Sequence, residues 1–297
     1  MRLTKQNICH YLLDRGFIDI KPVVDGDFSV SQEYGRNIVF KIHRRSEPGL
    51  FVKQITDMNH QNCYLLQKEA TCYWLFKNDR DFAKIKEVVP GYSGYDAQWQ
   101  ILVVEYIKNA NNLHHIFLNE KNQPAEYARQ MGNILGLLHV DIMDKIDDSP
   151  SLQFFARQVP WALQIDTLNT ESFFPGSTVP QLFQFIRPQT RFLEAIASAR
   201  EEWDPTCLIH GDVKLTNFIS VPYDGNGEQK APNVKLIDWE IADIGDPYWD
   251  VAGAFQSFIA PWILTFDNAE PASNRVQPGM DGFALGLARE SAAETWN

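Results

Sequence analysis

The side chains best suited to chemistry lie in two short stretches of the C-terminal half. In LIHGDVKLTN, residues 208–217, an apolar run leads to a His-Gly-Asp turn, and an asparagine follows five residues after the aspartate. In VKLIDWE, residues 234–240, a second apolar run ends in an acid. Phosphoryl transfer requires a carboxylate to orient a hydroxyl and accept its proton, and an amide oxygen and a second carboxylate to hold Mg²⁺ against the phosphates. Asp212, Asn217 and Asp238 fit these roles in that order.

The order and spacing of these groups resemble those of a known enzyme family. Residues 210–217 have the H-x-D-x-x-x-x-N spacing of the protein-kinase catalytic loop. The glycine in the position of the kinase arginine, with Asp246-Pro247 and Asp250 downstream, resembles instead the aminoglycoside phosphotransferase and choline kinase family. Each motif is short, but their order and the apolar runs before them favour the resemblance jointly. The likeness extends over about residues 28–259 in the order of its elements.

The resemblance implies an α+β, two-lobed protein-kinase-like fold. We expect a small N-lobe built on an antiparallel sheet over residues 1–107 and a mainly helical C-lobe over residues 108–297. In the resembling family an insertion at about residues 144–204 contributes to the acceptor-substrate site; the alternative is a helical subdomain that only fills core. Prolines divide this insertion and aromatic residues enrich it, which predicts short amphipathic helices under an aromatic surface.

The activity implied is transfer of the γ-phosphate of a nucleoside triphosphate, ATP or alternatively GTP, to a hydroxyl of a small molecule. Asp212 would be the base, and Asn217 and Asp238 would hold Mg²⁺. One alternative is a kinase of peptide or protein Ser/Thr hydroxyls, but the short distance from Asp238 to Gly245 leaves no room for a long activation loop. The other is a pseudokinase-like module that binds nucleotide without turnover; all three catalytic positions are filled, which gives no reason to prefer it.

The N-terminal region must place a cation near these acids. Three antiparallel strands and a helix are predicted, at residues 28–30, 38–40, 50–55 and 57–76. Lys53 lies in the third strand, and Glu69 falls on the apolar face of the helix, where a carboxylate needs a partner. We expect an ion pair between them, as in kinases, with Lys53 directed at the nucleotide phosphates. The alternatives are a lysine on a solvated strand face and a Glu69 that merely borders the apolar stripe.

Two further segments are assigned to the nucleotide by resemblance. The turn at residues 32–37, which covers the phosphates in a kinase, holds one glycine and no GxGxxG, so we interpret its side chains as those of an ordinary hairpin turn. Residues 98–107 form an apolar strand that runs into a polar segment. The resemblance makes this the hinge, where the backbone of Glu105 and Ile107 would bind the adenine.

The remaining candidates support the site. A hairpin through residues 218–221 and 234–237 would bring Asn217 and Asp238 to the same end of two paired strands. His210 and Asp250 are supporting residues, and the resemblance implies that Asp250 accepts hydrogen bonds from the loop backbone. Asp246 with Pro247 is a helix start, and that helix is predicted to end at Pro261. Glu240 would assist a second Mg²⁺ or contact a cationic substrate.

Composition narrows the partners. The 297-residue chain carries a net charge of −11, which argues against nucleic acid or an anionic membrane surface. The four cysteines form no CxxC, so a reduced, cytoplasmic setting is expected. His139, near the end of a predicted helix from Pro124, is interpreted as a structural or capping histidine.

The C-terminal tail departs from the resembling family. After Pro261 only one helix, carrying Phe283, Leu285 and Leu287, is predicted. In the resembling family several helices follow this point and help to wall the acceptor pocket, and one short helix covers less of that pocket. We therefore expect an open acceptor side with exposed aromatic surface, completed by another copy of the chain or a separate protein. The alternative is a tail that folds back over a shallow pocket.

Overall fold

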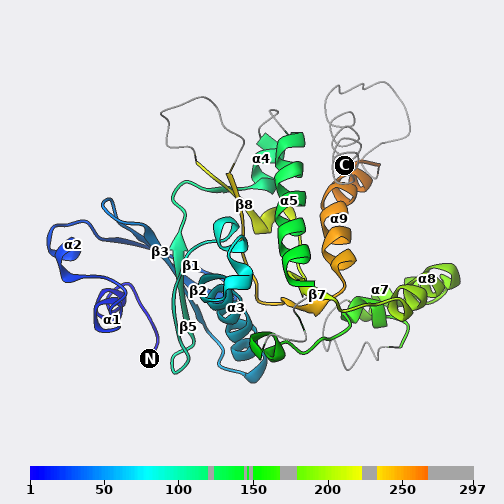
Figure 1. Ribbon diagram of the computed structural model, residues 1–297, viewed down its shortest axis with the longest axis horizontal. Helices are drawn as coiled ribbons and strands as arrows, with labels where there is room; N and C mark the ends of the chain where they lie inside the picture. The colour runs from blue at the N-terminus through cyan, green and yellow to red at the C-terminus, as the bar shows by residue number, and fades with distance from the viewer. Residues whose placement is uncertain (120–123, 144–145, 147–149, 168–178, 223–232, 267–297) are drawn as a thin grey trace.

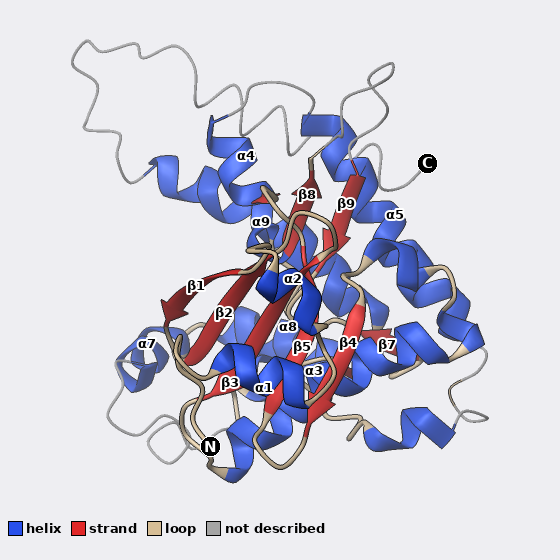
Figure 2. Cartoon of the chain, turned by 90° about the vertical axis from the view of Figure 1, so that its left-hand side faces the viewer, coloured by secondary structure: helices blue, strands red, loops and turns tan. Residues whose placement is uncertain are grey.

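The computed structural model describes residues 1–297 except 120–123, 144–145, 147–149, 168–178, 223–232 and 267–297. Its N-terminal part holds a five-stranded antiparallel sheet in the order β1-β2-β3-β5-β4 (Figure 2). The strands are β1 Ser29–Tyr34, β2 Asn37–His43, β3 Gly49–Ile55, β4 Tyr92–Asp96 and β5 Ile101–Tyr106. The three strands expected first are present and longer than predicted, so the turn between β1 and β2 narrows to Gly35 and Arg36.

The two faces of this sheet are buried by different elements, because successive side chains of a strand point to opposite sides. Ile38, Phe40 and Ile42 of β2 pack with helix α1, Ile8–Asp14, and the chain start on one face. Val39 lies opposite Lys53 in the register of β2 and β3, and Lys53 lies opposite Leu102 of β5. This second face is covered by helix α3, His60–Asn78. The sheet therefore presents Lys53 to the helix that carries Glu69.

Helix α3 begins at an asparagine cap. The side chain of Asn59 accepts a 2.8 Å hydrogen bond from the backbone N–H of Asn62, satisfying one of the free donors of the first turn. The helix therefore starts three residues later than its apolar pattern indicates. Leu66, Cys72 and Phe76 on its buried stripe join the main hydrophobic core, which extends into the C-terminal part.

Helices dominate the C-terminal part (Figure 1). The longer helices are α4 Leu113–Asn119, α5 Pro124–Met143, α7 Val179–Ile186, α8 Thr190–Glu201 and α9 Pro247–Phe266. Five short strands, β6 Asn111–Asn112, β7 Cys207–Ile209, β8 Phe218–Val221, β9 Asn233–Leu236 and β10 Asp243–Gly245, form the sheets β10-β7 and β6-β8-β9. Short helices complete the described chain: α2 Ile20–Val24, η1 Arg80–Phe82, η2 Ile85–Val88, η3 Pro150–Phe154, η4 Trp161–Gln164 and η5 Leu215–Asn217.

Helix α9 shows where one expectation was wrong. The backbone stays helical through Pro261 to Phe266, whereas the helix was predicted to end at that proline. A proline inside a helix removes one N–H from the ladder and crowds the carbonyl four residues earlier, but the helix continues across it here. The predicted helix of the tail and the turn at 223–227 lie outside the described residues.

The segment 144–204 is built from short helices where it is described. Phe155 and Phe183 are buried, whereas Phe185 is 75% exposed and Trp161 and Phe192 are each 46% exposed. This part of the expected aromatic surface is therefore present, while Phe173 and Phe174 lie outside the described residues. All four cysteines are free thiols. Among the helices that the structure describes, none has both the length and the apolarity needed to cross a bilayer.

Candidate active site

The loop at residues 210–217 depends on a glycine and a histidine. Gly211 has φ +82°, and a Cβ there would lie 2.8 Å from the carbonyl oxygen of Ile241, so only glycine fits without strain. The backbone N–H of Asp212 donates to Nδ1 of His210, and Nε2 of His210 lies 2.9 Å from the carbonyl of Ile237. Because Nδ1 accepts, Nε2 must carry the proton that it donates to Ile237. His210 thus ties the His-Gly-Asp turn to the strand that leads into Asp238.

Asp250, in the first turn of α9, binds the backbone of the same loop. It is fully buried, and its two carboxylate oxygens accept from the backbone N–H groups of His210 at 2.7 Å and Gly211 at 2.9 Å. Nε2 of His139 lies 3.0 Å from Asp250 Oδ2. The indole of Trp249 donates to the carbonyl of Gly211. The predicted contact of Asp250 with the loop therefore forms, and His139 lies against the same carboxylate.

Asp212 and Asn217 face each other across the loop. The side-chain nitrogen of Asn217 donates to the backbone carbonyl of Asp212 at 2.9 Å and to its carboxylate at 3.1 Å. The amide oxygen of Asn217 therefore points away from Asp212. The ammonium of Lys214 also contacts the Asp212 carboxylate. Asp212 keeps 35% of its side chain exposed, so it is accessible from solvent.

The hairpin β8–β9 brings the second motif beside the first. Phe218 lies opposite Leu236, and the N–H of Ile237 donates to the carbonyl of Asn217 at 2.9 Å. Asp238 follows with φ +71°, a backbone conformation that non-glycine residues rarely adopt. Strain of this kind persists only where surrounding contacts hold it, and here Lys53 binds the Asp238 carboxylate at 3.1 Å.

Lys53 is the centre of an acidic cluster. Its Nζ lies 2.7 Å from Glu69, 3.1 Å from Asp238 and 3.3 Å from Glu240. Burial opposes the charge of Lys53, but the three carboxylates raise the pKa of its ammonium above the ordinary value. The predicted Lys53–Glu69 pair thus forms, and the solvated-lysine alternative does not hold, since Lys53 is only 8% exposed.

The carboxylates of the cluster respond differently to this crowding. Glu69 is buried, with 5% exposed, and burial raises its pKa to about 7 although the charge of Lys53 lowers it, with the charges of Asp238 and Glu240 adding to the rise. Burial also opposes ionisation of Asp238, but the charge of Lys53 and its hydrogen bond, with His210 and Lys214 farther away, lower the pKa of Asp238 below its usual value. Asp238 is therefore more firmly ionised than Glu69.

The donor set fits a hard divalent cation. Glu69, Asp238 and Glu240 each offer a carboxylate oxygen, and these oxygens lie within 4.8 Å of one another. Three carboxylates meet two cationic side chains here, Lys53 and Arg36, so the cluster has an excess of negative charge whenever Glu69 is ionised. Oxygen ligands and excess negative charge are what Mg²⁺ prefers.

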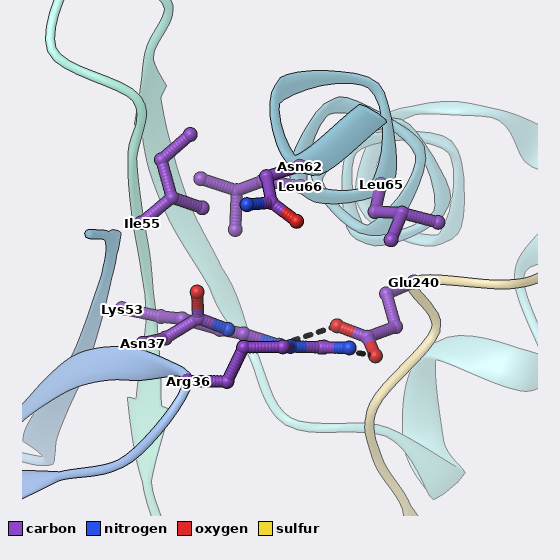
Figure 3. Close-up of a pocket in the computed structure, with 8 residues that line it drawn as sticks. All are labelled: Arg36, Asn37, Lys53, Ile55, Asn62, Leu65, Leu66 and Glu240. Atoms are coloured by element: carbon purple, nitrogen blue, oxygen red, sulfur yellow. Dashed lines mark hydrogen bonds and ion pairs between the residues drawn. The ribbon is translucent and has the colours of Figure 1, made fainter. Parts of the chain in front are cut away.

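Glu240 reaches a residue that the sequence patterns did not single out. One of its oxygens contacts Arg36 of the β1–β2 turn and the other contacts Lys53 (Figure 3). The second overlooked residue is Lys214, beside Asp212. The available signal was weak: each is a single basic residue inside a stretch already under consideration.

The segment expected to act as the hinge is only partly open to a ligand. The N–H of Glu105 donates to the carbonyl of Gly91 at 2.7 Å, and the Glu105 carboxylate accepts from the N–H of Gly91 at 3.0 Å. The carbonyl of Ile107 accepts from Ala110. The N–H of Glu105 and the carbonyl of Ile107 are therefore engaged within the chain and are not available to an adenine.

Comparisons with known proteins address the family and the fold. A family model described as phosphotransferase enzyme family matches residues 83–284. A choline/ethanolamine kinase family protein from Mesorhizobium loti is 15% identical with a TM-score of 0.50, covering 99% of this chain and 96% of its own. A macrolide 2′-phosphotransferase from Brachybacterium faecium is 14% identical with a TM-score of 0.50, covering 98% and 88%. At these identities the likeness shows the fold, which confirms the expected two-lobed kinase-like architecture.

One curated protein shares a short stretch. Acyl-CoA dehydrogenase family member 10 of Mus musculus is 38% identical over 56 residues, which amount to 19% of this chain and 5% of that protein. The match thus spans a small fraction of that relative's length, and it says nothing about the rest of that protein's activity here.

Proposed function

This chain belongs to the phosphotransferase enzyme family, and from that premise we propose that it transfers the γ-phosphate of a nucleoside triphosphate to a hydroxyl of a small molecule. ATP is the expected donor, with Mg²⁺ as the metal. The observation that carries the proposal is the convergence on Lys53, which binds Glu69 of α3 and also Asp238 and Glu240 of the second motif. A buried ammonium among three carboxylates is suited to receive a metal-bound polyphosphate.

Each side chain then has a distinct task. Asp212 would orient the acceptor hydroxyl and take its proton, and its carboxylate also contacts Lys214. Asn217 and Asp238 would hold Mg²⁺, which when bound neutralises charge on the phosphates. Lys53 would bind phosphate oxygens, positioned by Glu69. Asp250 and His210 would keep the loop in place through the backbone contacts described above.

A small molecule is favoured over a protein as acceptor. The chain that follows Asp238 enters β10 within a few residues, and β10 pairs with β7 through Asp243 and Ile209. A segment this short, paired to β7 at its end, cannot contain the long activation loop that orders a peptide groove in protein kinases. Peptide phosphorylation is therefore the second candidate.

A nucleotide-consumption screen tests the proposal. Aminoglycosides, choline-like amines, sugars, nucleosides and Ser/Thr peptides would each be supplied with ATP or GTP and Mg²⁺, using wild type and Asp212→Asn. We expect acceptor-dependent consumption that is lost in Asp212→Asn. Consumption with peptides alone would favour the second candidate. Tight nucleotide binding without consumption by any acceptor would indicate a module that binds without turnover.

We also propose that a second chain completes the acceptor-substrate site. Leu182 and Phe185 of α7 are 56% and 75% exposed, and Phe192 of α8 is 46% exposed. Apolar surface of this kind often marks a contact with another protein. Light scattering over a concentration series tests the idea; a monomer with full activity on a small hydroxyl substrate would contradict it.

A further inference from the structure

The turn between β1 and β2 covers the acidic cluster without a glycine-rich backbone. It contains Gly35 and Arg36, and the N–H of Gly35 donates to the carbonyl of Asn37 at 3.1 Å. That donor is engaged within the hairpin and cannot contribute to a phosphate cradle. A charged side chain is therefore the stronger contact that this turn can offer to phosphates.

Arg36 is placed to provide it. Its carbonyl accepts a 2.8 Å hydrogen bond from the hydroxyl of Thr56, which follows β3, so the turn is anchored at its base. From there the guanidinium extends across to Glu240, as Figure 3 shows. Arg36 is still 59% exposed, whereas Glu240 is 14% exposed. The arginine therefore approaches the cluster from the solvent side.

The contact between Arg36 and Glu240 joins the turn to the cluster on Lys53. Glu240 is shared, since its other oxygen lies 3.3 Å from the ammonium of Lys53. The hydrogen bond to Glu240 raises the pKa of Arg36, and the charges of Glu240, Asp238 and Glu69 add to this while partial burial opposes it. The guanidinium thus lies within the field of the same carboxylates that surround Lys53.

We propose that Arg36 binds the phosphates of the nucleotide, exchanging the Glu240 carboxylate for phosphate oxygens when the nucleotide enters. This inference rests on the proposed function and adds to it a phosphate contact that replaces a glycine-rich loop. An arginine binds carboxylate and phosphate with the same planar set of donors, so the exchange requires no new kind of contact. Glu240 meanwhile becomes available to a cation, which the excess negative charge of the cluster favours.

Nucleotide affinity measured without metal separates this role from a structural one. ATP and adenosine would be titrated calorimetrically in the presence of a chelator, because adenosine lacks the phosphates. Arg36→Ala should weaken ATP binding by roughly tenfold or more, the effect of losing one charged hydrogen-bond donor, and leave adenosine affinity unchanged. Arg15→Ala is the matched control, because Arg15 forms an ion pair with Asp96 at 3.0 Å and is 44% exposed. Arg15 directly follows α1, whose Tyr11 packs on the opposite face of the sheet.

A second variant keeps the test decisive. Glu240→Gln removes the competitor of Arg36, so it should strengthen ATP binding in chelator, and the gain should shrink when Arg36→Ala is also present. A purely structural bridge would instead make both single variants weaken binding alike. If the ratio of ATP affinity to adenosine affinity is the same in wild type, Arg36→Ala and Arg15→Ala, the inference about Arg36 is overturned and the proposed function is not. Failure of wild type to prefer ATP to adenosine even when Mg²⁺ is present would overturn the proposed function with it.

Discussion

Oδ2 of Asp250 accepts a 2.7 Å hydrogen bond from the backbone N–H of His210, 40 residues earlier in the chain. The same carboxylate accepts from Gly211 and lies 3.0 Å from His139. A fully buried carboxylate with three donors is satisfied only while those donors keep their positions. The first turn of α9 therefore holds the turn that carries Asp212.

Replacing this carboxylate should destabilise the protein. Asp250→Asn puts an NH₂ group where a backbone N–H must donate, so a buried donor loses its acceptor. We expect the free energy of unfolding to fall by about 2–4 kcal/mol, measured by chemical denaturation. Asp246→Asn is the matched control on the same helix, because Asp246 caps Tyr248 N–H at 2.9 Å and asparagine caps as well as aspartate. Equal losses in the two variants would contradict the role of Asp250.

The acidic cluster predicts a particular dependence of stability on pH. Burial raises the pKa of Glu69 from 4.5 to about 7, so between these values the folded chain holds a proton that the unfolded chain has lost. The contribution of Glu69 to stability is thus complete below pH 4.5, falls as the pH rises, and is level above about 7.

Glu69→Gln removes that titration. In metal-free protein, the free energy of unfolding of Glu69→Gln relative to wild type should rise by about 3 kcal/mol across this window. Denaturation of both proteins in chelator, at a series of pH values spanning the window, gives the difference. Parallel curves would show that Glu69 titrates normally.

Much of the site was predictable because its determinants are local. A helix cap, a strand period and the spacing between Asp212 and Asn217 are encoded within a few residues, and the β8–β9 pairing then follows from the apolar runs. The Lys53–Glu69 pair was also predictable, since a carboxylate on an apolar helix face requires a cation and Lys53 was the natural candidate.

Contacts between distant segments were harder to predict. Arg36 and Glu240 are 204 residues apart, and nothing in the turn sequence shows which way the arginine extends once the strands lengthen to Tyr34 and Asn37. The continuation of α9 across Pro261 was missed for a different reason. The local preference of proline against a helix interior is outweighed there by the rest of the helix.

The metal assignment predicts how nucleotide binding responds to Mg²⁺. Wild type should bind ATP more tightly with Mg²⁺ than in chelator, whereas Asp238→Ala should bind it equally in both, because the variant lacks the proposed ligand whose pKa is lowered below the usual value. Asn217→Ala should reduce the Mg²⁺ effect in part. Calorimetry under both conditions, with Asp246→Asn as the control that keeps all proposed ligands, measures this. An undiminished Mg²⁺ effect in Asp238→Ala would place the metal elsewhere.

The central claim is that Asp212 acts on the acceptor hydroxyl while other residues bind the nucleotide. Its most direct test is the rate of γ-phosphate transfer in Asp212→Asn and wild type, with MgATP affinity measured on the same samples and with the acceptor that the screen identifies. The side chains around Lys53 are untouched by this change. We therefore predict unchanged affinity and a transfer rate lower by about 10²–10⁴-fold. Near-normal transfer by Asp212→Asn would contradict the account.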